Sequence, residues 1–152
     1  MKFVTLCDYY EMHRPGYKDV YIILKAIMKR LSRQDEINTV LSPEYIFYNE
    51  KTHGVRFTVA DKYAVAEVEG MNILFKYMSS VSVYSGKNVM ELIKEVECRY
   101  KENGSQKAYE WLEKTERKNK ISFVISVMFI IVVAGLLILY YTKIQPFFFI
   151  IE

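Results

Sequence analysis

An uncharged apolar run near the C-terminus constrains this chain more than any other feature. Residues 121–141 read ISFVISVMFIIVVAGLLILYY and contain neither a charged residue nor a proline. A helix of about 20 apolar residues spans the hydrocarbon core of a bilayer, whereas a buried core helix of a soluble protein keeps a polar face. We therefore expect a transmembrane helix over 121–141. Its large side chains would form the membrane anchor: Ile121, Phe123, Val127, Phe129, Val132, Leu136, Leu139, Tyr140 and Tyr141.

The basic residues beside this run are distributed unevenly. Lys114, Arg117, Lys118 and Lys120 precede it, and Lys143 follows it. Cytoplasmic flanks of membrane spans carry the excess of Lys and Arg, so we expect a single-pass protein of the cell membrane with a cytoplasmic N-terminus. Residues 142–152 would then form a short tail outside, with the aromatic residues of 146–151 in the outer interface.

The polar part of the chain shows no sign of a cofactor, metal or nucleic-acid site. The net charge of +3 is small, and no stripe of Lys and Arg alternates with aromatic residues as in single-strand binders. Cys7 and Cys98 lie far apart and neither belongs to a CxxC or Cys–His pattern, so we interpret them as unpaired, reduced thiols in a cytosolic domain. The sequence also lacks a P-loop, a GxGxxG and an HExxH motif. We therefore expect no cofactor, no metal and no nucleic-acid partner.

The first 104 residues predict a mostly helical α+β domain with one β-hairpin. Apolar residues recur every three or four positions in three stretches, which indicates amphipathic helices over 17–32, 68–78 and 86–100. Two stretches rich in β-forming residues, 45–48 and 55–59, flank a turn at 49–54 and predict the hairpin, with Val55, Phe57 and Val59 on its buried face. Residues 3–6 are expected to form a short strand and residues 7–16 a connector.

Asn103-Gly104 is expected to end the third helix, and Ser105 to open another. No proline or glycine lies between Ser105 and Ala134, which favours a helix that continues unbroken into the span as a rigid stalk. The predicted organisation is a cytosolic domain at 1–104, a juxtamembrane helix at 105–120, the span at 121–141 and the tail at 142–152.

One stretch resembles part of the protein kinases. Residues 41–49, LSPEYIFYN, followed by GVRF at 54–57, are similar to the kinase pattern LKPENILLD…GxVKL of the catalytic loop and the hairpin after it. Residues 1–100 also resemble degenerate bacterial kinase-like domains attached to forkhead-associated modules, and the membrane-anchored pseudokinase of type VII secretion (the EssB/YukC family). This resemblance implies a truncated kinase C-lobe before one transmembrane helix. The alternative is an unrelated hairpin that happens to contain LSPE.

The residues for phosphoryl transfer do not carry over from that resemblance. Val40 stands at the position of the catalytic aspartate, Tyr45 at that of the metal-binding asparagine, and Val59 near that of the aspartate of the DFG motif. Phosphoryl transfer needs a base, metal ligands and a phosphate-binding lysine, so we expect neither kinase activity nor ordinary ATP binding. His53, beside Gly54, is interpreted as a turn residue rather than a ligand, because the sequence shows no relation between it and His13 and no carboxylate cluster accompanies either.

These features lead to three hypotheses about function. The first is a non-catalytic, single-pass membrane-anchored interaction or scaffold protein in a bacterial secretion or signalling complex. Its partners would be the lipid bilayer and an unknown protein, in a homo-oligomer or a hetero-oligomer. The second is a small membrane-active protein whose working part is 121–152. The third is an enzyme whose site the motifs do not reveal.

Overall fold

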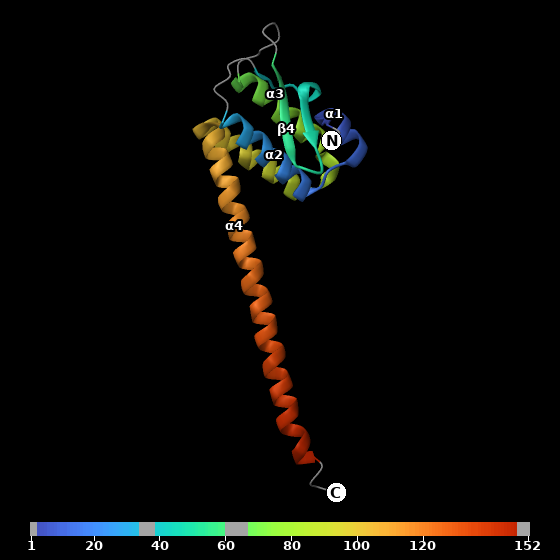
Figure 1. Ribbon diagram of the computed structural model, residues 1–152, viewed down its shortest axis with the longest axis vertical. Helices are drawn as coiled ribbons and strands as arrows, with labels where there is room; N and C mark the ends of the chain where they lie inside the picture. Colours follow the sequence, from blue (N-terminus) through green and yellow to red (C-terminus); the bar gives the residue numbers. More distant parts are fainter. Residues whose placement is uncertain (1–2, 34–38, 60–66, 149–152) are drawn as a thin grey trace. The chain divides into compact units, whose positions relative to one another are not determined.

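The computed structural model describes residues 3–33, 39–59 and 67–148, and the chain divides into two compact units, Met1–Glu113 and Lys114–Glu152 (Figure 1). Helices predominate. The elements in chain order are β1 (Val4–Thr5), α1 (Leu6–His13), α2 (Tyr17–Leu31), β2 (Thr39–Val40), the 3₁₀ turn η1 (Pro43–Tyr45), β3 (Ile46–Asn49), β4 (Gly54–Val59), α3 (Glu67–Val81), the 3₁₀ turn η2 (Val83–Ser85) and α4 (Lys87–Phe148).

The predicted hairpin is confirmed as β3 and β4, which pair antiparallel with Ile46 opposite Phe57. It is the centre of a small antiparallel sheet with strand order β1-β3-β4-β2, in which a two-residue strand pairs with each outer edge of the hairpin. Val55 and Phe57 pack against the core as expected. The prediction for Val59 was wrong, because this side chain lies at the end of β4 and is 55% exposed.

Residues 6–13 form helix α1, where a strand end and a connector had been predicted, and that prediction was wrong. The Thr5 hydroxyl accepts a hydrogen bond from the Asp8 amide at 3.1 Å and caps the helix N-terminus. Arg14 ends α1 in the left-handed region (φ 44°), where its amide donates to the carbonyl of Tyr10. Leu6, Tyr9 and Tyr10 are buried, so α1 is part of the core.

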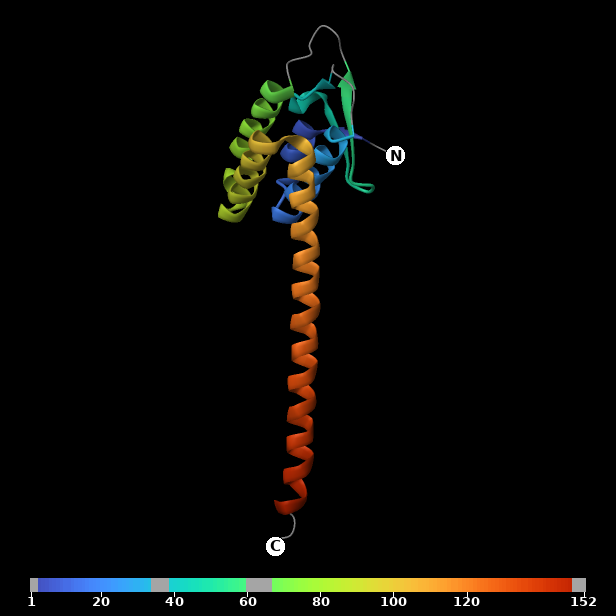
Figure 2. The same ribbon diagram turned by 90° about the vertical axis from the view of Figure 1, so that its left-hand side faces the viewer.

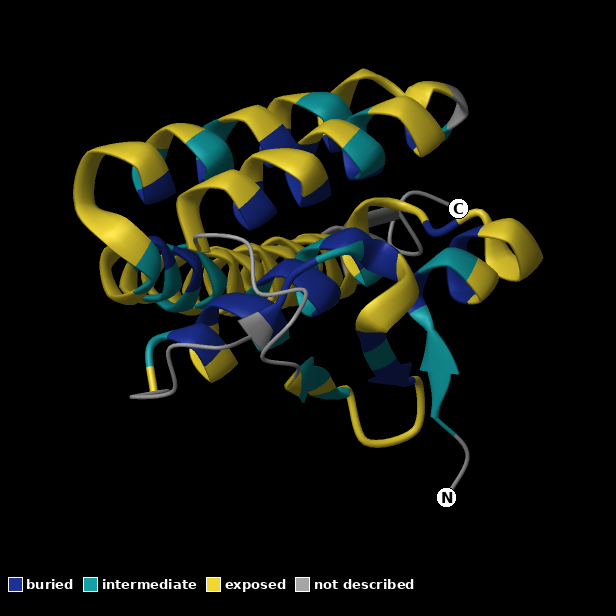
Figure 3. Cartoon of the chain, turned by 90° about the horizontal axis from the view of Figure 1, so that it is seen from above, coloured by how far each residue is buried: buried dark blue, intermediate teal, exposed yellow. Residues whose placement is uncertain are grey.

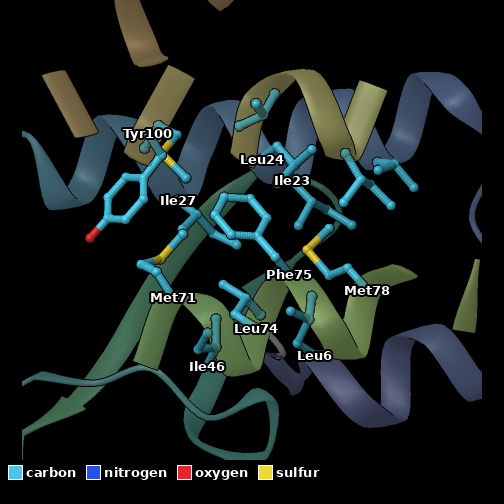
Figure 4. Close-up of a cluster of buried hydrophobic side chains, with 14 of the residues drawn as sticks. Leu6, Ile23, Leu24, Ile27, Ile46, Met71, Leu74, Phe75, Met78 and Tyr100 are labelled. Carbon is cyan, nitrogen blue, oxygen red and sulfur yellow. The ribbon is translucent and has the colours of Figure 1, made fainter. Parts of the chain in front are cut away.

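The predicted helices over 17–32 and 68–78 are confirmed as α2 and α3. In the first unit α2 lies between the sheet and the pair formed by α3 and the first part of α4 (Figures 2 and 3). Side chains from α1, α2, β3, α3 and α4 meet in one cluster (Figure 4), whose labelled members are Leu6, Ile23, Leu24, Ile27, Ile46, Met71, Leu74, Phe75, Met78 and Tyr100.

Helix α4 begins at Lys87, and a glycine interrupts its helical backbone. Gly104 has φ 77° and ψ −178°, values outside the helical region, so the predicted end of a helix at this glycine is confirmed. The backbone is helical again from Ser105 to Phe148. Ala108 and Leu112 are fully buried in the core of the first unit, which is why that unit extends beyond residue 104.

The second unit contains the apolar run. Among the described residues, α4 is the one helix with an apolar stretch long enough to cross a bilayer, and none of that stretch is buried within the protein. It is therefore a candidate membrane span, judged by its length and composition.

Candidate functional site

The apolar part of α4 exposes every side chain that the sequence assigns to a membrane anchor. The exposed fractions run from 38% at Val127 to 70% at Phe123, and include 67% at Tyr141. A soluble protein rarely leaves so large a continuous apolar surface in water, because apolar area costs about 25 cal/mol per Å² when exposed. This surface needs an apolar environment, which a bilayer or another protein can supply.

Two hydroxyl groups, one within the run and one directly after it, bond to the helix itself. The Ser126 hydroxyl donates to the carbonyl of Ser122 at 3.0 Å, and the Thr142 hydroxyl donates to the carbonyl of Leu139 at 3.1 Å. These polar groups thus need no water, which suits a segment in a medium that offers no hydrogen bonds.

The net positive charge of the chain comes from the segment that contains the apolar run and its flanks. Residues 114–152 carry five Lys or Arg and two Asp or Glu, a difference of three, and the whole chain has a net charge of +3. The first 113 residues are therefore balanced. Lys114, Arg117, Lys118 and Lys120 all lie on α4 before the run, where Lys120 pairs with Glu116 at 2.6 Å.

The positions that correspond to kinase catalytic residues lie on separate elements. Val40 is in β2, Val59 ends β4, and Tyr45 ends η1 with 47% of its side chain exposed. The Ser42 hydroxyl donates to the Glu44 carboxylate within the LSPE stretch. In the part of the chain that the structure describes, no three His, Cys, Asp or Glu side chains gather as metal ligands would.

The two histidines of the chain stand at the ends of one row of aromatic rings, a relation that their spacing in the sequence did not show. The His13 ring lies 4.9 Å from that of Tyr9, and Tyr9 lies 4.9 Å from Tyr48 in an edge-to-face arrangement. Tyr48 in turn lies 6.3 Å from the His53 ring, centre to centre. The row joins the end of α1 to the hairpin turn, and the unrecognised α1 is the reason that the sequence did not reveal it.

Two adjoining hollows lie beside α1, and we call them together the α1 groove. The first has a volume of about 470 Å³ and the second about 430 Å³. They share Val4 and Met12, and Met12 is 60% exposed. The first is also lined by Tyr9, His13, Tyr48, Asn49, Glu50 and Lys51, and the second by Phe3, Thr5, Asp8, Glu11 and Phe47. Volumes of this size are typical of ligand sites.

Burial is the main influence on the two tyrosines of the groove. Burial raises the pKa of the Tyr9 phenol, and the negative charges of Asp19 and Glu50 raise that pKa further. The pKa of Tyr48 is raised by burial above all, and also by the same two carboxylates. Burial and the nearby negative charges therefore both disfavour the phenolate form of these side chains.

Tyr10 and Ser82 bury two hydroxyls that make no regular hydrogen bond with the described part of the chain. Tyr10 is 4% exposed and Ser82 is fully buried, and neither hydroxyl has a partner with hydrogen-bonding geometry among the described residues. Burial raises the pKa of Tyr10, and the nearby Ser82 hydroxyl partly opposes this effect. The pair is a weak point of the core, since a buried polar group without a full partner costs stability.

Comparison of the chain with protein-family models, with curated proteins and with solved structures gives no match. No family, activity or partner can be transferred to this protein from a relative, and the resemblance to kinase-like domains stays a prediction.

Proposed function

We propose that this chain is a non-catalytic, single-pass protein of the cell membrane whose N-terminal unit docks a partner protein on the cytoplasmic side. The apolar and uncharged stretch of α4, none of which is buried within the protein, carries this proposal. The N-terminal unit is built around a continuous core, and the sequence offers no catalytic motif within it. Docking beside the membrane is the activity that such an arrangement serves.

The orientation follows from the charge beside the run. Four Lys or Arg residues lie within a short segment before it, at 114, 117, 118 and 120, and Lys143 is the one that follows in the sequence. The excess of Lys and Arg near a span lies on the cytoplasmic side. The first unit would then be cytoplasmic, as the reduced thiols of Cys7 and Cys98 also favour.

Membrane integration is tested with the full chain produced in a bacterial host. Washed membranes are extracted with alkaline carbonate, which removes peripheral proteins and leaves integral ones. We expect the chain to stay in the membrane pellet. The double substitution Val132→Lys/Leu136→Lys should move it to the supernatant, since a lysine at the centre of a span costs about 2.5–3.5 kcal/mol.

The control places a lysine at an equally exposed apolar position of the first unit. Val68 is 60% exposed and Val132 is 56% exposed, so Val68→Lys matches one of the two substitutions in added charge and in lost surface hydrophobicity. Val68→Lys should leave the chain in the pellet. Release of the unmodified chain by carbonate would contradict the membrane part of the proposal.

The docking part has its own test. Crosslinking in intact membranes should join the chain to a second protein or a second copy. A chain that forms no crosslinks there and is a monomer in detergent would contradict a scaffold role. Function retained by a chain that lacks residues 1–110 would instead favour a small membrane-active protein.

A further inference from the structure

We infer that Asn103 is a site of spontaneous deamidation, in which the Gly104 nitrogen attacks the Asn103 side chain, and that the products weaken the first unit. This inference goes beyond the proposed function and does not depend on it, because it concerns the covalent chemistry of the chain itself. Three observations carry it: the one Asn-Gly pair of the sequence, the break in the helical backbone at its glycine, and the exposure of both residues.

The reaction needs no partner except water. The Gly104 amide nitrogen loses its proton to base in the solvent and bonds to Cγ of Asn103, and the Cγ–Nδ2 bond breaks as ammonia leaves. The product is a succinimide, a five-membered ring. Water then opens the ring at either carbonyl, which gives an aspartate or an isoaspartate whose main chain runs through the side chain. The net change is the loss of ammonia and the gain of water.

The backbone at this pair leaves the regular helix. Gly104 has φ 77° and ψ −178°, between helical stretches that begin at Lys87 and Ser105, and the chain changes direction there (Figure 2). Glycine has no Cβ beside its nitrogen, so the attacking atom is unhindered and the local backbone can reach the geometry of attack. Asn103 and Gly104 are both exposed, so water and base reach them.

Two other asparagines show how the fold protects such a side chain. Asn49 is 2% exposed, and its Oδ1 accepts a hydrogen bond from the Thr52 amide at 3.0 Å. Asn88 is exposed, but the amide that would attack it belongs to the buried Val89 and donates to the Gly86 carbonyl at 3.1 Å. Attack at either asparagine first needs these contacts to open, and the opening of an ordered element costs free energy.

The products would disturb a connection inside the first unit. Ala108 and Leu112 follow the break and are fully buried in the core. An isoaspartate at 103 lengthens the main chain of this connection by one atom. Either product also adds a negative charge beside Glu102, at the C-terminal end of the helical stretch that begins at Lys87, where the helix dipole disfavours it. Both effects should lower the stability of the first unit.

The test follows the full chain in micelles of a non-ionic detergent during storage at mildly alkaline pH. Samples are digested briefly with trypsin and analysed by mass spectrometry, which records the exchange of the side-chain NH₂ for OH. Trypsin places Asn103 in the peptide 102–107 and Asn88 in the peptide 88–94. We expect Asn103 to convert about tenfold or more faster than Asn88, with isoaspartate among its products.

Asn103→Gln is the matched variant. It keeps the carboxamide and the break at Gly104, but its longer side chain would have to close a six-membered ring, which forms far more slowly. The stored unmodified chain should unfold at a lower urea concentration than the fresh chain, as followed by Trp111 fluorescence, whereas stored Asn103→Gln should match its fresh sample. Fresh Asn103→Asp carries the charge without the longer main chain, so it should unfold between the fresh and the fully converted chain.

Each outcome decides the inference. Conversion of Asn103 no faster than that of Asn88 would overturn the site. Full conversion without a change in the urea midpoint would overturn the effect on the first unit, and so would an equal loss of stability in stored Asn103→Gln, which would mean that storage weakens the chain through another group.

Discussion

The Tyr48 hydroxyl lies 2.9 Å from Nδ1 of His53, across the turn of the β3–β4 hairpin. Tyr48 is 1% exposed, while His53 stands in the left-handed region with φ 53°. The turn therefore carries an unusual backbone conformation, and its histidine side chain is tied to a core tyrosine. This bond links the hairpin to the aromatic row that ends at His13, and so helps to hold the wall of the α1 groove.

Replacement of His53 should separate its hydrogen bond from its backbone conformation. His53→Ala loses the bond to Tyr48 and keeps the left-handed strain, so it should destabilise the first unit by about 1 kcal/mol. His53→Gly loses the same bond but relieves the strain, and should be about 1 kcal/mol more stable than His53→Ala. Urea unfolding of the full chain in detergent micelles, followed by Trp111 fluorescence, measures both. Equal stabilities of the two variants would contradict this account of the turn.

Gly70 is required where α3 passes close to Leu41. A Cβ at this position would lie 2.9 Å from Cβ of Leu41, which is closer than Cβ contacts in proteins come, and Leu41 is itself 2% exposed. Overpacking should cost Gly70→Ala about 1–3 kcal/mol, and the higher helix propensity of alanine should offset about 1 kcal/mol of this. We therefore expect Gly70→Ala to destabilise the unit. Gly16→Ala is the control, because no atom lies within 4 Å of its added Cβ. Stabilisation by Gly70→Ala in urea unfolding would show that the contact relaxes at no cost.

Removal of the two poorly bonded hydroxyls in the core should not harm the protein. Tyr10→Phe/Ser82→Ala replaces both members of the pair with apolar groups, which is nearly neutral or stabilising when the hydroxyls are poorly satisfied. Ser82→Ala alone keeps the Tyr10 hydroxyl buried without a partner, so it should be about 1 kcal/mol or more less stable than the double variant. Thermal unfolding of the three proteins gives the order of stability. A double variant less stable than Ser82→Ala would contradict it.

The first unit should lose stability in alkaline solution. Burial raises the pKa of Tyr10, Tyr48 and Tyr100 in the folded protein, above the value of about 10 in an unfolded chain. Below a pH of about 10 the folded and the unfolded protein both keep these phenol protons, so the free energy of unfolding does not change with pH through these groups. Above it the unfolded chain releases protons that the folded protein keeps, so stability falls as pH rises, by up to about 1.4 kcal/mol per pH unit for Tyr10.

Urea unfolding at a series of pH values measures this slope. Tyr10→Phe/Ser82→Ala should show a shallower loss above pH of about 10, since one raised phenol is gone. The same loss in both proteins would mean that other groups cause the alkaline effect.

Long periodic segments could be predicted from the sequence because they repeat their pattern over several turns. The stripe from Val20 to Leu31 is buried as its spacing indicates, and so is the second stripe from Met71 to Met78, but its predicted first member, Val68, is 60% exposed. The alternation of apolar and polar residues around Val55 and Phe57 likewise predicted the second strand of the hairpin. The apolar run of α4 was visible because its composition alone distinguishes it from the rest of the chain.

Short elements and distant contacts were not predictable in this way. Helix α1 has eight residues, too few for a clear period, and β1 and β2 have two residues each. The α1 groove depends on α1 lying against β3, which brings Tyr9 to Tyr48. Such contacts between residues far apart in the chain leave no local pattern, so neither the groove nor the shared row of His13 and His53 could be read from spacing.

The central claim is that α4 crosses the membrane with the first unit inside the cell. Labelling of single cysteines with a membrane-impermeant maleimide tests it most directly. Cys98 is exposed on the first unit and stays as the only thiol in Cys7→Ser. A second protein, Cys7→Ser/Cys98→Ser/Glu152→Cys, carries its thiol at the C-terminus. Glu102 raises the pKa of the Cys98 thiol, so its labelling needs a long exposure.

We predict that intact cells label the cysteine at 152 and that Cys98 reacts only after the cells are opened. Labelling of Cys98 in intact cells, or protection of both cysteines until the cells are opened, would contradict the claim.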